Sequence, residues 1–451
     1  MVTRTADFLG RAQRGLSVLE PLFPDTPPPS RARRAVVILY GIAFFALTTV
    51  VLLRQSGVSS TRTIWAEDGP VFYAQALVHP FGQTLTTTYA GYYQLFPRLA
   101  MEVARLFPVR DAAGVIALIG AMTVAALALI VFHATRGHIP SSGARCVLVA
   151  ATILLPLATA ELLDNVVNVP WWLFYVTFWM LLWKPLSWPG SILAATICLL
   201  ATGSDPSVGL FLPLAVVRMA EVRGVRENLV VIGFFGGLLY QLAALLNAGY
   251  QSSTAHGTLH ELGDLFALRV GLGSFTGTRL TNLIITSRHA AYVAAGIFVI
   301  VLVGLAAGFQ RDRSVKLLVW VALVFACLTF VVPVWVRGAA PVMTNTTVNF
   351  GSRYVAVPVL LVLSAFIVEA DGMRWRRGVR HLNVGVLLCL VLLVPCWIVD
   401  LRTPNERSVA VSWSTEVLRA TSACHRTHAM SESLITSPTG WATPVPCSDL
   451  G

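Results

Sequence analysis

The sequence predicts an all-α integral membrane protein, a polytopic bundle of about eleven transmembrane helices. Of its 451 residues, 56% are apolar and 12% are charged, which is about half the charged fraction of an ordinary soluble domain. Apolar runs of the length that a bilayer requires recur along the chain. They lie at about residues 35–53, 112–133, 145–162, 168–183, 189–203, 206–220, 228–247, 289–309, 317–336, 353–369 and 383–401.

The basic residues between these runs predict the orientation of the bundle. Arg31, Arg33 and Arg34 directly precede the first run, which places the N-terminus in the cytoplasm. We read 189–220 as two short spans that meet near Asp205, because a single span would move three later basic connections to the outside. The net charge of +11 thus follows topology signals, and we expect no nucleic-acid partner.

This topology divides the chain into three parts. Residues 1–34 are expected in the cytoplasm, residues 35–401 form the bundle with an outer loop at 54–111, and residues 402–451 form an extracytoplasmic tail. Cys424 and Cys447 lie in that tail, on the oxidising side of the membrane, where a disulfide is expected. Two free thiols are the alternative. No Cys or His spacing indicates zinc.

The first outer loop contains an amphipathic pattern. Apolar residues recur at helical spacing between Leu95 and Phe107, and Arg98, Glu102 and Arg105 share another face. Pro97 falls where a helix would begin, a position that tolerates its missing N–H. The pattern predicts a helix that lies in the membrane interface, or else one that packs on the end of the bundle.

Glu67 and Asp68 form an acidic pair directly after the first predicted span. Charge beside hydrocarbon is costly and suggests a function. Transfer of a sugar from a lipid phosphate to a hydroxyl requires a carboxylate that accepts the proton of the acceptor. Gly69 and Pro70 favour a turn that would present the pair. Alternatively, Asp68 caps a helix that begins at Pro70.

A second acidic cluster lies on the same predicted face. Glu161 and Asn165 are four residues apart, so they would share a face if the helix continues. Trp171 and Trp172 follow them, either as interface tryptophans or as a platform for a sugar ring. Asp205 is expected to cap a short span. The departing phosphate also needs positive charge, and Arg98, Arg337 and Arg353 are the candidates, with headgroup contact as the alternative.

The chain resembles the GT-C superfamily of polytopic glycosyltransferases, which use polyprenyl-phosphate sugars at the extracytoplasmic face. The resemblance is carried by Trp65 to Gly69 (Trp-Ala-Glu-Asp-Gly), by Tyr93 to Arg98, by Glu161 with Asn165, Asn168 and Trp171, by Arg353-Tyr354, and by a tail with a Cys near its end. It implies catalysis by an acidic residue of the first outer loop, which falls on Glu67 or Asp68. It also implies a multi-pass protein of the bacterial plasma membrane.

The expected function is therefore an inverting transfer of a monosaccharide from a polyprenyl-phosphate donor to an envelope glycan or glycolipid, with membrane lipids as further partners. Glu67 or Asp68 would be the base, Glu161 and Asn165 would position the acceptor or a metal, and Arg98 and Arg353 would hold the donor phosphate. A divalent cation (Mg or Mn) stays open, because the two acids are adjacent rather than spaced as Asp-x-Asp. The alternatives are a transporter or flippase for a lipid-linked sugar, and a non-catalytic envelope-assembly protein.

Overall fold

The computed structural model describes residues 19–28, 33–55, 57–248, 257–285, 289–310, 312–339, 343, 348, 350–372, 374–377 and 380–450. Most of the predicted N-terminal segment 1–34 and part of the predicted loop 248–288 lie outside these ranges.

The described chain is mostly helical, and six of its helices are long and apolar enough to cross a membrane. This is the pattern of a multi-pass membrane protein. The six are α2 (Arg33–Leu53), α6 (Ala112–Ala134), α11 (Val225–Ala248), α15 (Arg313–Val336), α16 (Ser352–Asp371) and α17 (Val384–Leu401).

Three further apolar helices are shorter, namely α7 (Ser142–Ile153), α8 (Val169–Leu182) and α9 (Trp188–Ser204). In α14 (His289–Phe309) the apolar stretch is Val293–Phe309. The expected count of eleven full spans therefore goes beyond the six that the helix lengths support. The predicted run 206–220 divides into a 3-10 segment, Pro206–Phe211, and α10 (Leu212–Glu221). Neither piece alone has the roughly 20 residues that a span needs.

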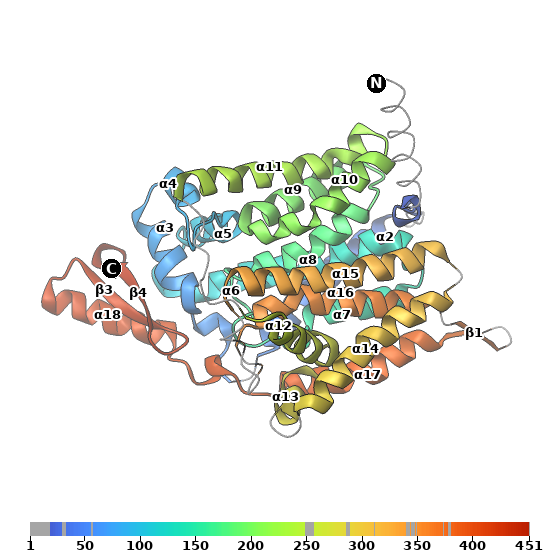
Figure 1. Cartoon of the computed structure of the whole chain (residues 1–451). Helices are drawn as coiled ribbons and strands as arrows, with labels where there is room; N and C mark the ends of the chain where they lie inside the picture. Colours follow the sequence, from blue (N-terminus) through green and yellow to red (C-terminus); the bar gives the residue numbers. More distant parts are fainter. Residues whose placement is uncertain are drawn as a thin grey trace.

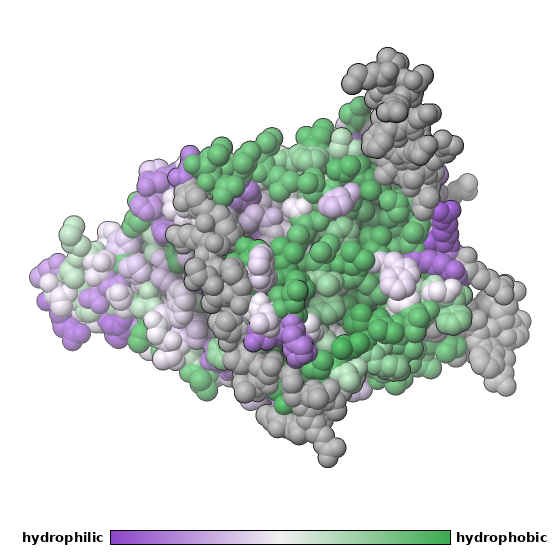
Figure 2. Space-filling view, in the orientation of Figure 1, coloured by the Kyte–Doolittle hydropathy of each residue, from purple (hydrophilic) through white to green (hydrophobic). Residues whose placement is uncertain are grey.

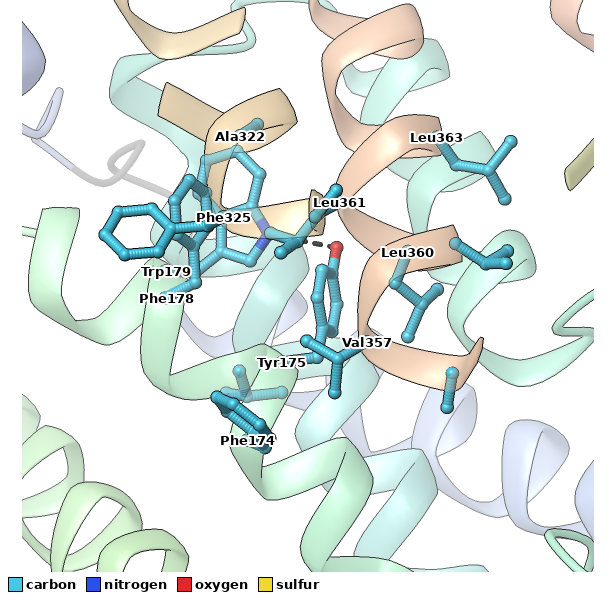
Figure 3. Close-up of a cluster of buried hydrophobic side chains, with 14 of the residues drawn as sticks. Phe174, Tyr175, Phe178, Trp179, Ala322, Phe325, Val357, Leu360, Leu361 and Leu363 are labelled. Carbon is cyan, nitrogen blue, oxygen red and sulfur yellow. Dashed lines mark hydrogen bonds between the residues drawn. The ribbon is translucent and has the colours of Figure 1, made fainter. Parts of the chain in front are cut away.

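The centre of the bundle is formed by α8 and α16, in which nearly every residue is buried. A helix that is apolar on all sides is expected in such an interior. Phe174 and Phe325 both pack edge to face against Phe211, and Phe178 packs in the same way against Phe325. Figure 3 shows Phe174, Phe178 and Phe325 in one buried cluster with leucines of α16. The apolar flank of the bundle is left exposed, whereas hydrophilic residues gather over the C-terminal tail and at the opposite edge (Figure 2).

Smaller elements lie at the two ends of the bundle (Figure 1). One end carries α3 (Ala74–Val78), α4 (Phe81–Thr86), α5 (Leu95–Ala104) and the C-terminal tail. The tail consists of α18 (Trp413–Thr427) and the antiparallel strands β3 (Ser431–Thr436) and β4 (Trp441–Pro446), paired from Ser431↔Pro446 to Thr436↔Trp441. The other end carries the hairpin of β1 (Arg374–Arg377) and β2 (Arg380–Asn383). Two more helices are α13 (Gly273–Ile285), which packs beside α14 and α17, and α12 (Leu259–Leu265), which contacts α15.

The predicted helix 145–162 ends early. α7 stops at Ile153, because Pro156 lacks an N–H and disfavours helix in the residue before it. Leu157 and Asp164 have positive φ values of 65° and 54°, which no α-helix accommodates. The expectation that Glu161 and Asn165 share one helical face is therefore wrong, and residues 154–168 form a folded loop instead.

The amphipathic segment of the first loop does form a helix, α5, and its charged face points inward. Arg98 and Glu102 are buried, whereas Val103, Leu106 and Phe107 are exposed. Glu102 accepts a hydrogen bond from Thr84 and pairs with Arg105 at 2.9 Å. An apolar stripe facing outward is the arrangement that a helix at a membrane interface needs.

Candidate functional site

Two cavities meet at Glu67 and Arg353, the only two residues that line both of them among the described residues. The first, which we call the tail cavity, has a volume of about 320 Å³ and includes Glu161, Asn405 and Trp441 in its wall. The second, which we call the tyrosine cavity, has a volume of about 360 Å³ and includes Tyr89 and Tyr92. Cavities of this size are typical of ligand sites.

Glu67 projects from a short 3-10 helix, Ala66–Asp68. The Trp65 side chain that precedes it is buried and anchors the turn. The Glu67 side chain is 13% exposed, and its Oε1 lies 3.8 Å from Nη1 of Arg353. Burial raises the pKa of Tyr89 to about 12, so the Tyr89 hydroxyl keeps its proton and donates it toward Oε1 of Glu67 at 3.5 Å. Glu67 is thus oriented and still accessible from both cavities.

Arg353 links Glu67 to Glu161. Its Nε lies 3.1 Å from Oε1 of Glu161, while Oε2 of Glu161 accepts hydrogen bonds from the backbone N–H and the hydroxyl of Ser352, at 2.8 and 3.1 Å. Arg353 stands in the first turn of α16, which fixes its position at the end of the bundle. Three segments far apart in the sequence supply this cluster: Glu161 lies 94 positions after Glu67, and Arg353 lies 192 positions after Glu161.

 

Asp68 has a different environment from its neighbour. It is fully buried, and its two carboxylate oxygens accept hydrogen bonds from the backbone N–H groups of Val166 and Val167 at 3.0 and 2.8 Å. Burial raises the pKa of Asp68 to about 7, against the opposing effect of these hydrogen bonds. Its side chain makes no capping bond to the helix that follows. Asp68 therefore ties the first loop to the loop after α7 and faces neither cavity.

The tyrosine cavity contains a second ion pair. Arg337 donates to Oδ2 of Asp205 at 3.2 Å and to the Tyr92 hydroxyl at 3.0 Å. Asp205 also caps the 3-10 segment Pro206–Phe211 by accepting from the N–H of Ser207 at 2.8 Å, as expected. Tyr89 and Tyr92 flank a tight turn in which Ala90 and Gly91 have positive φ values, and this turn presents both rings to the cavity.

An apolar groove adjoins the tyrosine cavity. Tyr92 lines both spaces, and Pro206 of the groove follows Asp205 of the cavity. The groove has a volume of about 370 Å³ and runs along α11, where Leu242 and Leu245 are exposed. A charged cavity that continues into an apolar groove suits an amphipathic ligand.

Two of the residues predicted for the site lie elsewhere. Arg98 is 1% exposed. Its guanidinium bonds Gln75 and the Thr87 carbonyl and covers the Phe72 ring at 4.7 Å, and it lines neither cavity. Asn165 is buried, and its amide donates to the backbone carbonyl of Glu161 at 2.7 Å. Both residues hold loops in place near the site.

The residues present do not fit a divalent cation. The guanidinium of Arg353 already lies between the carboxylates of Glu67 and Glu161, and the third nearby acid, Asp68, is engaged by backbone N–H groups. Among the described residues, no three His, Cys, Asp or Glu side chains gather as a metal site. We derive no step through a metal.

Residues of the C-terminal tail form part of the wall of the tail cavity. Cys424 and Cys447 are joined by a disulfide that connects the end of α18 to the end of β4. Trp441 packs against Trp65, Ala66 and Ala160. The signal for this contact is a tryptophan, Trp441, among polar residues near the end of the chain.

Comparison with known proteins gives no relative from which a function follows. No protein-family model, no curated protein and no solved structure matches this chain.

Proposed function

We propose that this chain is a glycosyltransferase of the GT-C type. It would move a monosaccharide from a polyprenyl-phosphate donor to a cell-envelope glycan or glycolipid. In this proposal the chain spans the bacterial plasma membrane, the N-terminus is cytoplasmic, and both cavities open at the outer face. The resemblance of Trp65 to Gly69 to that superfamily supports this reading.

One observation carries the proposal: among the described residues, Glu67 is the one carboxylate that lines both cavities. A transfer between two substrates needs a base within reach of both the acceptor hydroxyl and the reacting carbon of the donor. Asp68 has no such access because it is buried against Val166 and Val167. We therefore assign the role of base to Glu67.

The tyrosine cavity suits the donor. Arg337 and Arg353 supply positive charge for a phosphate, and guanidinium groups bind phosphate oxygens with two donors. The apolar groove beside Tyr92 would take the polyprenyl chain. The tail cavity, on the other side of Glu67, is left for the acceptor.

The proposed step is a single displacement. Glu67 takes the proton of an acceptor hydroxyl as its oxygen forms a bond to the anomeric carbon. The bond from that carbon to the phosphate oxygen breaks, and the electron pair leaves with the polyprenyl phosphate, whose charge Arg337 and Arg353 compensate. Attack from the side opposite the phosphate inverts the anomeric configuration.

The test is transfer by the purified full-length protein in lipid vesicles, with radiolabelled polyprenyl-phosphate sugars and an envelope extract from the organism that encodes the chain. Glu67→Gln should lose transfer by about 10²-fold or more, while the control Glu432→Gln, on β3 away from both cavities, retains it.

Equal transfer by folded Glu67→Gln and the unmodified protein would contradict the proposal. Movement of labelled lipid across the vesicle without a new glycosidic bond would favour the transporter instead.

A further inference from the structure

The segment that follows α17 supplies a large share of the lining of the tail cavity. Its lining residues are Thr403, Pro404, Asn405, Glu406, Pro438 and Trp441. The same cavity is lined by Glu67, Glu161 and Arg353. A ligand that fills this cavity would therefore contact both the tail and the proposed base.

The tail is fixed to the loop that carries Glu67. The N–H of Ser437 donates to the carbonyl of Ile64 at 2.9 Å, and the N–H of Ala66 donates to the carbonyl of Ser437. Arg407 is buried, lies 5.2 Å over the Trp65 ring and donates to the carbonyl of Leu163 at 3.1 Å. The tail thus holds a defined position beside the site.

The chemistry of this wall suits a carbohydrate. Trp441 packs one part of its surface against Trp65 and remains half-buried, so the rest of its ring is open to the cavity that it lines. Asn405 and Glu406 supply an amide and a carboxylate beside it. A sugar ring has apolar C–H faces that stack on an aromatic ring and hydroxyls that bond to polar groups at its edge.

We propose that the tail cavity is the acceptor subsite, in which Trp441 stacks on a saccharide unit of the acceptor chain and Asn405 and Glu406 bind its hydroxyls. This inference rests on the proposed function, because it names the substrate class of one half of the same site. It makes the C-terminal tail the segment that selects the acceptor.

The test is binding of oligosaccharides to the purified full-length protein, measured by native mass spectrometry. The probe is the oligosaccharide pool released by mild acid from the envelope of the encoding organism. Trp441→Ala should weaken binding by about tenfold or more, and Trp441→Phe should restore part of it. The control Ile435→Ala changes an exposed side chain of the same hairpin, away from the cavity, and should bind as the unmodified protein does.

The outcomes separate the two proposals. Normal binding by Trp441→Ala, or no binding of the pool by the unmodified protein, overturns the acceptor subsite. Loss of binding in Trp441→Ala together with no transfer by the unmodified protein keeps the saccharide site and overturns the transferase.

Discussion

The centre and the end of the bundle treat their polar side chains differently. At the centre, the Tyr175 hydroxyl accepts a hydrogen bond from Trp179 and pairs with Ser364, both at 2.9 Å. At the end, the Glu67 carboxylate lines two cavities. In the interior, these three side chains bond to one another. At the site, charged groups are held by one contact and keep another side accessible. A polar side chain can contact a ligand only where part of it stays accessible, so the cavities at the end of the bundle are the place for a reaction.

Arg353 gives the largest expected effect on the open side of this comparison. Arg353→Ala should lower transfer by about 10²- to 10³-fold, because it removes a charge beside the leaving phosphate. Arg353→Lys should recover little, since one ammonium cannot reach both Glu67 and Glu161 as the guanidinium does. Steady-state transfer in vesicles measures both.

The control for Arg353 is Arg279→Ala, which removes an exposed arginine of the tail cavity that is not shared with the tyrosine cavity. It should lose much less activity. Equal losses in the two variants would mean that the shared wall has no special role.

The sequence predicted the helices better than the site. Apolar runs identify helices because burial in lipid or in the core requires them, and each predicted run contains one. The loop after α7 was missed because Pro156 falls inside an apolar run, which hides the end of the helix. The turn at Ala90 and Gly91 was missed because Ala is rarely found at positive φ. The distinction between Glu67 and Asp68 depends on contacts with Val166 and Val167, which no local pattern reveals.

Asp68 provides a pH test of its closed environment. Its pKa rises from 3.8 to about 7 on burial, so the folded chain holds a proton that the unfolded chain releases between about pH 4 and 7. The stabilisation is complete below pH 4 and is lost as the pH rises through 7. A shift of about 3 units corresponds to about 4 kcal/mol at most. The apparent Tm of the unmodified protein should therefore fall across this window more than that of Asp68→Asn.

The control for this titration is Asp111→Asn, which changes an exposed aspartate and should keep the pH dependence of the unmodified protein. The same slope in Asp68→Asn would show that Asp68 is ionised in the fold throughout the window.

The disulfide of the tail should contribute about 3 kcal/mol to the stability of that segment, the value expected for closing a loop of about 20 residues. It joins residues 23 positions apart. Replacing Cys424 and Cys447 by Ser should speed cleavage of the tail in limited proteolysis while the bundle stays intact. Cys327→Ser, at a free cysteine of α15, should leave the rate unchanged. Equal rates in all three proteins would mean that the tail is held by its packing alone.

Tyr175 and Tyr89 form a matched pair across the comparison, with the smallest expected effect on stability. Tyr175→Phe leaves the indole N–H of Trp179 without its acceptor in the core, which should cost about 1 to 3 kcal/mol and lower the apparent Tm without changing transfer. Tyr89→Phe removes the donor to Glu67 and should lower transfer with little change in Tm. Both transfer and apparent Tm are measured on both variants. If polar groups in the core stabilise the fold and those at the cavities take part in the reaction, Tyr175→Phe lowers only the Tm and Tyr89→Phe lowers mainly transfer. A loss of transfer in Tyr175→Phe with its Tm unchanged would break that division.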